Sequence, residues 1–355
     1  MGRRLLPLVL VVFAPAACSP TSSGDPAEPR GDAPLHPMPQ PGLARGEAAV
    51  LLNRTCEGCH AAEAAEWRAS LHRTSHTEPA YQRSFAIEPL AFCRRCHAPE
   101  GDPTREPPPA VGEMGVGCVT CHVVDEQVLA APRNGSRANA TGAPHPVVRD
   151  ARFATADACA SCHEFAFPGG SPLRAEELMQ STVREHAASP HAAASCASCH
   201  MPLAPDGRRT HAFAASRDPE ILRASIRASA QRVSSTTVEV TLAPVGVGHA
   251  LPTGDLFRRL EISAEAFGAD NLVVASSRRY LTRHFTVGKG AAGKRLERDD
   301  RLTGERTIEV DLGPDADGHP VAWRIGYQRV AHPSGATHED AVLEDDVELA
   351  SGVIQ

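Results

Sequence analysis

The arrangement of apolar and polar residues divides the chain into two parts. After about residue 231, apolar and polar residues alternate, as in Val-Glu-Val-Thr-Leu at 238–242, and Gly and Pro separate the alternating stretches. Alternation with a period of two is typical of β-strands that are buried on one face. We therefore expect residues 231–350 to form a C-terminal antiparallel β-domain, with a sandwich-like arrangement.

Residues 43–215 have a different composition, with short helical segments between loops. Aromatic residues make up only 4% of the chain, which is few for a protein that fills its core with its own side chains. This part is therefore expected to be mainly α-helical and irregular, and to wrap around something other than protein. Helical segments fit at 43–52, 61–72, 79–92 and 174–188, and segments rich in Pro, Gly and Asn indicate loops at 99–117 and 131–149.

Ten of the 11 cysteines occur in five Cys-x-x-Cys-His motifs, all within residues 43–215. This motif attaches c-type haem: the two cysteines bind the haem covalently, and the following histidine binds the iron. Five such motifs are a strong signal, and we predict a multihaem c-type cytochrome domain wrapped around five haem c groups. The predicted attachment residues are Cys56, Cys59, Cys93, Cys96, Cys118, Cys121, Cys159, Cys162, Cys196 and Cys199. The predicted proximal iron ligands are His60, His97, His122, His163 and His200.

Other readings of paired cysteines fit less well. Five pairs do not divide into four-thiolate zinc sites, and zinc does not need a histidine after every pair. A disulfide framework would suit an exported protein, but it gives no reason for the histidines. Thioredoxin-like chemistry needs a βαβ context that the sequence does not indicate.

Each iron needs a second axial ligand unless it is open to a substrate. Of 17 histidines, five lie in the motifs, which leaves 12. An internal repeat, Glu-x-x-Ala-Ser-x-His, occurs at 66–72 and at 185–191, so we expect His72 and His191 to have the same role on two irons. The other predicted distal ligands are His145, in a loop after the third motif; His211, after the fifth motif; and His249, in a turn of the β-domain.

Two more histidines, His76 and His186, are reserve candidates for the distal positions. Met201 directly follows a proximal histidine, so its side chain cannot reach the opposite face of the same iron. Ligation by two histidines is therefore the default expectation. It implies reduction potentials below those of haems with one histidine and one methionine.

The motifs, together with Trp67-x-x-Ser70-x-His72 and Cys199-His200-Met201-Pro202, resemble the cytochrome c-554 and hydroxylamine oxidoreductase group of multihaem cytochromes. The resemblance covers about residues 45–213. It implies closely packed haem pairs that form an electron-transfer chain, and a distal-ligand role for His72. Enzymes of this group attach more haems or cross-link a tyrosine to the catalytic haem, and related nitrite reductases use a Cys-x-x-Cys-Lys motif, which is not found here.

The N-terminus has the features of an export signal. Two arginines precede an apolar stretch at 5–13, and small residues follow up to Cys18. The sequence Ala-Ala-Cys at 16–18 resembles a bacterial lipobox, which predicts a signal peptide at 1–17 and lipidation of Cys18. The alternative is ordinary cleavage after Ala14-Pro15-Ala16, which would leave Cys18 as a free thiol. Residues 18–42 then form a disordered tether, and the expected location is the periplasm or the outer membrane.

A net charge of −7 without a basic cluster gives no indication of nucleic-acid binding. The leading hypothesis is electron transfer between redox partner proteins rather than catalysis. In one alternative, a haem without a distal histidine acts on a small nitrogen or sulfur compound. In another, the β-domain docks the haem subunit in a membrane redox complex.

Overall fold

The computed structural model describes residues 38, 43–132, 144–214, 218–286, 294–331 and 341–355. The predicted signal peptide, Cys18 and all of the predicted tether except residue 38 lie outside these ranges. Within them, no helix is both long enough and apolar enough to cross a membrane.

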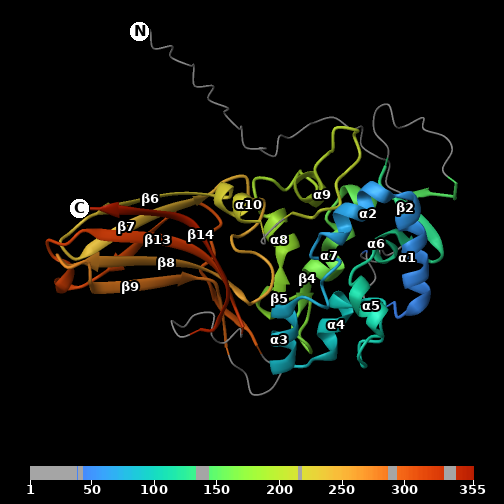
Figure 1. The fold of residues 1–355 in the computed structure, drawn as a ribbon, viewed down its shortest axis with the longest axis horizontal. Helices are drawn as coiled ribbons and strands as arrows, with labels where there is room; N and C mark the ends of the chain where they lie inside the picture. The colour runs from blue at the N-terminus through green and yellow to red at the C-terminus, as the bar shows by residue number, and fades with distance from the viewer. Residues whose placement is uncertain (1–37, 39–42, 133–143, 215–217, 287–293, 332–340) are drawn as a thin grey trace, which may run out of the picture.

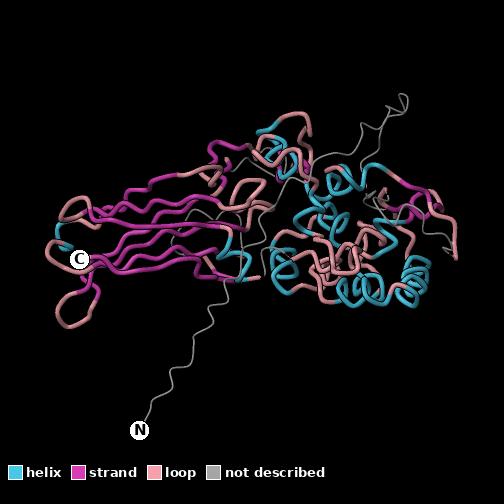
Figure 2. The backbone as a smooth tube through the Cα atoms, turned by 90° about the horizontal axis from the view of Figure 1, so that it is seen from above, coloured by secondary structure: helices cyan, strands magenta, loops and turns pink. Residues whose placement is uncertain are grey.

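The described residues form a part made of short helices and loops and a part made of long strands, which lie side by side (Figure 1, Figure 2). The helices of the first part are α1 (Glu47–Cys59), α2 (Ala61–Arg68), α3 (Pro79–Ile87), α4 (Ala91–His97), α5 (Pro109–Met114), α6 (Cys118–His122), α7 (Asp157–His163), α8 (Thr182–Ala187) and α9 (Cys196–His200). Its short strands are β1 (Val123–Val124), β2 (Gln127–Ala130), β3 (Val148–Arg149), β4 (Glu164–Ala166) and β5 (Leu178–Ser181).

The second part contains the antiparallel strands that the alternating pattern predicts. One sheet has the order β12-β7-β6 and another the order β14-β13-β8-β9, and each neighbouring pair is antiparallel. The first strand begins at residue 226 rather than 231. The bounds are α10 (Pro219–Ala224), β6 (Ile226–Arg232), β7 (Thr237–Pro244), β8 (Arg258–Phe267), β9 (Val273–Leu281), β10 (Arg283–Phe285), β11 (Leu296–Asp299), β12 (Arg306–Asp311), β13 (Val321–Val330) and β14 (Leu343–Ile354).

One apolar core joins the two sheets into a sandwich. Val240 on β7, Ile262 on β8 and Ile325 on β13 are fully buried in the same cluster. Burying the inward-facing half of each strand is what stabilises two stacked sheets, because it removes apolar surface from water.

The helical part has a much smaller core of its own. Its main cluster consists of Ala49, Val50, Trp67, Val111, Met114, Val119 and Val123. The Trp67 indole N–H donates to the Val116 carbonyl at 2.8 Å and satisfies the polar atom of that buried ring. The expectation that this part does not fill its interior with its own side chains therefore agrees with the small size of the cluster.

Two of the expected local structures are wrong in detail. Residues 174–188 are not one helix, because strand β5 lies within them and pairs with β4. The strand alternates buried and half-buried side chains, so burial there has a period of two rather than 3.6. The expected loop at 99–117 contains α5, which starts with a proline at its first turn and buries Val111 and Met114.

Candidate cofactor-binding site

Each Cys-x-x-Cys-His motif occupies the last turn of a short helix. The motifs lie at the ends of α1, α4, α6, α7 and α9, and only in α1 does the helix stop one residue before the histidine. Residues three apart share one face of a helix. The two cysteine side chains and the imidazole of each motif are therefore presented together by one rigid turn.

Four of the five motif histidines lie opposite a histidine from a distant part of the chain. An imidazole nitrogen binds a first-row metal at about 2 Å and lies about 1.2 Å from its own ring centre, so two imidazoles across one metal have centroids about 6.3 Å apart. The observed spacings fit this value. The pairs are His60–His145 at 6.5 Å, His72–His163 at 6.3 Å, His122–His211 at 6.2 Å and His200–His249 at 6.3 Å.

Hydrogen bonds fix which nitrogen of these rings is available. The Nδ1–H group of His122 donates to the Leu129 carbonyl at 2.8 Å, and that of His249 donates to the Ala250 carbonyl at 3.0 Å. A ring that donates from Nδ1 keeps the lone pair of Nε2 free to bind a metal. The same contact to a main-chain carbonyl is made by His97, His145, His200 and His211.

The burial of the paired histidines also fits a large prosthetic group. Burial and the neighbouring His200 lower the pKa of His163 to about 4. Burial, followed by His163, lowers the pKa of His72 to about 3. The motif residues and the paired histidines thus fit a haem held between them.

The second motif differs from the other four. Among the described residues, no imidazole lies at the metal-bridging spacing from His97. Instead, Tyr81 from α3 stacks on the His97 ring, with centroids 3.8 Å apart and an interplanar angle of 11°. The reserve candidate His76 contacts Tyr81 and Glu106. The structure thus places four of the five predicted distal histidines opposite a motif histidine.

His191, which the repeat predicts as a distal ligand, is in none of the ring pairs of the described residues. It lies beside Gly248: a Cβ placed on Gly248 would be 3.3 Å from the His191 Cβ and 3.2 Å from the Cδ2 of His186. A larger residue at 248 would therefore push against both histidines. Ligation of an iron by His191 stays a prediction.

The motifs that are neighbours in space are not always neighbours in sequence. The second and fourth motifs lie close together, because the neighbouring Cys162 raises the pKa of Cys96, while Cys96 lowers the pKa of Cys162. Beside them, Phe92 and Phe165 meet edge to face with centroids 5.4 Å apart. The second motif, at the end of α4, is therefore packed against the fourth motif, at the end of α7.

The fourth motif also touches the fifth, and the first touches the third. Cys159 and Cys196 lie close together, because the neighbouring Cys196 raises the pKa of Cys159 and Cys159 lowers the pKa of Cys196 to about 7. In the third motif, the Val119 N–H donates to the side-chain oxygen of Asn53 at 3.4 Å. Asn53 lies on α1, three residues before Cys56 of the first motif.

Phe213 connects the third and fourth motifs. Its ring lies edge-on to His72 at 4.2 Å and to His211 at 5.9 Å. Its φ is +49°, a left-handed conformation that is unfavourable for a bulky side chain and persists only where the surroundings enforce it. The fourth motif thus lies close to the second and the fifth, and it is linked to the third through His72, Phe213 and His211.

Comparison with known proteins bears on the fold. No protein-family model matches the chain, and no curated protein matches it. A solved structure of a penta-heme cytochrome c552 from Thermochromatium tepidum is similar, with a TM-score of 0.63 and 20% identity over 88% of this chain and 100% of that chain. The expectation of a multihaem-cytochrome-like fold is therefore confirmed, while the specific group named from the sequence stays a prediction.

Proposed function

We propose that this chain binds five haem c groups and transfers electrons through them between redox partner proteins. The observation that carries the proposal is the set of four imidazole pairs with centroids 6.2–6.5 Å apart. Each pair joins a motif histidine to a second histidine, which leaves an iron between them no open position. When bound, haem supplies one-electron iron chemistry, and the protein sets its ligands and surroundings.

Contacts between the motifs support a branched path for the electrons. The first motif contacts the third, the third contacts the fourth through Phe213, and the fourth contacts both the second and the fifth. Electron tunnelling slows steeply with distance, so groups attached at touching motifs exchange electrons fastest. In this proposal the fourth motif is the junction of the relay.

The haem content tests the proposal directly. A haemochrome assay on the purified protein, with the protein concentration from amino-acid analysis, should return five haems per chain. A variant with Cys56→Ala and Cys59→Ala should return four. A wild-type value of four or fewer would remove at least one motif from the account.

The proposal includes export and attachment to a membrane by a lipid on Cys18, because the N-terminal segment has the charged, apolar and small-residue regions of a lipoprotein signal. Replacing Cys18 by serine should move the protein from the membrane fraction to the soluble periplasmic fraction, since a lipid anchor supplies the membrane affinity. Unchanged membrane association of C18S would reject lipidation.

The second motif favours one further candidate function. Because His97 has no imidazole partner at the metal-bridging spacing among the described residues, an iron bound there is the candidate for an open position. A haem of that kind could reduce a small nitrogen or sulfur compound with electrons from the fourth motif. Binding of carbon monoxide to one haem in the ferrous wild type would support this second function.

The β-domain takes part in either function. It supplies His249, whose ring lies 6.3 Å from that of the motif histidine His200. A role restricted to docking would not require it to reach into the site. We therefore include the β-domain in the electron-transfer unit.

A further inference from the structure

The internal repeat contains a glutamate that, in both copies, contacts an arginine and a backbone N–H at or beside a histidine of a ring pair. In the first copy, Glu66 accepts a hydrogen bond from the backbone N–H of His211 at 2.8 Å. The same carboxylate accepts hydrogen bonds from both Nη groups of Arg208, at 2.8 and 2.7 Å. Glu66 therefore holds the chain at the residue whose imidazole lies opposite His122.

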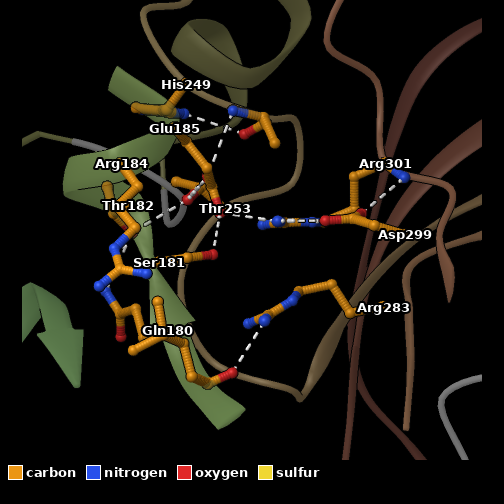
Figure 3. Close-up of polar contacts among 12 residues, drawn as sticks. Gln180, Ser181, Thr182, Arg184, Glu185, His249, Thr253, Arg283, Asp299 and Arg301 are labelled. Carbon is orange, nitrogen blue, oxygen red and sulfur yellow. Dashed lines mark hydrogen bonds and ion pairs between the residues drawn. The ribbon is translucent and has the colours of Figure 1, made fainter. Parts of the chain in front are cut away.

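In the second copy, Glu185 makes the equivalent contacts (Figure 3). It accepts a hydrogen bond from the backbone N–H of Ala250, the residue after His249, at 3.3 Å, and one from the Thr253 hydroxyl at 2.6 Å. The guanidinium of Arg301 lies 2.6 Å from the carboxylate. Glu185 thus holds the turn whose imidazole lies opposite His200.

Both carboxylates are held in the charged form. The hydrogen bond from Arg208 lowers the pKa of Glu66 to about 2. Burial acts to raise the pKa of Glu185, but Arg301 and the hydroxyl groups outweigh it, so that the pKa is lowered. Hydrogen bonds to a charged carboxylate are roughly twice as strong as those between neutral groups.

The two histidines need such support because they do not lie on helices or strands. His211 lies in an irregular segment and His249 in a bend. A metal ligand must be held to within about 0.5 Å of its productive position. A glutamate in the last turn of a helix, α2 in one case and α8 in the other, provides a rigid reference for each loop.

We propose that Glu66 and Glu185 are positioning residues that place the distal imidazoles of His211 and His249 on the irons of the third and fifth motifs. Arg208 and Arg301 keep each glutamate oriented. This inference rests on the proposed function, since it assumes that the four imidazole pairs bind iron. The first residue of each repeat copy thus has a role of its own, separate from that of the histidine at the end of the repeat.

The test uses the full-length holoprotein with Glu66→Ala, Glu66→Gln, Glu185→Ala and Glu185→Gln. In each alanine variant, one further haem should become high-spin in the ferric form and bind carbon monoxide in the ferrous form, and added imidazole should restore the low-spin signal. The glutamine variants keep an acceptor for the backbone N–H and should show smaller changes. They also keep the test valid if an alanine variant does not fold.

Double variants identify the haem that each glutamate serves. Adding Glu66→Ala to His211→Ala should convert no additional haem, because both changes act on the same iron, whereas adding Glu66→Ala to His249→Ala should convert one more. Glu63→Ala is the matched control for Glu66→Ala, because Glu63 lies on the same helix. Its carboxylate is 4.0 Å from the Nε of Arg208, which is longer than a hydrogen bond. This control should leave every haem low-spin.

Two results would overturn the inference. In one, the alanine variants lose thermal stability while their haem spectra match the wild type, which would show a structural role only. In the other, Glu63→Ala and Glu66→Ala change the spectra equally. If His211→Ala and His249→Ala themselves leave all haems low-spin, the proposed ligation fails instead, so the two failures are distinguishable.

Discussion

Replacing His72 by alanine is expected to convert one haem from low-spin to high-spin. The centroids of the His72 and His163 rings are 6.3 Å apart, the spacing expected for two imidazoles that would bind one metal. Alanine removes the only imidazole at that spacing from His163 among the described residues, and it leaves an iron with one protein ligand. The haem should then bind carbon monoxide, and its reduction potential should change, because the axial ligands tune it.

The measurement is the low-temperature electron paramagnetic resonance spectrum of the ferric variant, with a carbon monoxide difference spectrum of the ferrous form. About one fifth of the haem should respond if five are bound, since each motif binds one. His76→Ala is the control, because His76 lies close by in the sequence but contacts Tyr81 and Glu106 rather than a motif histidine. A spectrum of H72A that equals the wild type would reject His72 as a ligand.

Removing the haem of the fourth motif is expected to break the relay. A Cys159→Ala, Cys162→Ala variant should retain four haems, but its remaining motifs lose the contacts that join the second, third and fifth to one another. Electron transfer between the remaining haems should slow by orders of magnitude, because the gaps between them become longer and tunnelling decays steeply with distance.

Protein-film voltammetry tests this expectation by counting the haems that exchange electrons rapidly with the electrode. A Cys196→Ala, Cys199→Ala variant is the matched control, since it also retains four haems but loses only the fifth motif, which touches the relay through the fourth. The control should keep its four haems in rapid exchange. Equal behaviour of the two variants would show that the fourth motif is not the junction.

The sequence predicts the features whose chemistry is local. A Cys-x-x-Cys-His motif needs only one turn of chain, so all five could be found without knowledge of the fold. The strands of the β-domain can likewise be predicted from the sequence, because each buries one face and therefore alternates apolar and polar residues. The helix expected at 174–188 is wrong because strand β5 forms there by pairing with β4, a contact between segments 12 or more residues apart.

The pairing of the histidines depends on tertiary structure and could not be predicted. His72 follows the first motif by 12 positions in the sequence, yet its ring faces His163 of the fourth motif. His145, His211 and His249 were selected from their positions in loops and turns, and the structure brings each opposite a motif histidine. His191 was selected by its repeat, and the structure brings no motif histidine to the same spacing from it in the described part of the chain.

The supporting glutamates were present in the sequence but were not recognised as functional. Glu66 and Glu185 are the first residues of the two repeat copies, and the repeat was used only to align the histidines at its end. Their contacts, to the main chain beside His211 and His249, join segments 145 and 65 residues apart. Two glutamates at equivalent repeat positions were the available signal, and its meaning required the fold.

The most direct test of the central claim is the electron paramagnetic resonance spectrum of the fully ferric wild type, quantified per haem. The account predicts that at least four of the five haems are low-spin with two imidazole ligands, and that only a haem at the second motif can be high-spin. Two or more high-spin haems per chain would contradict the four imidazole pairs and, with them, the proposed electron-transfer function.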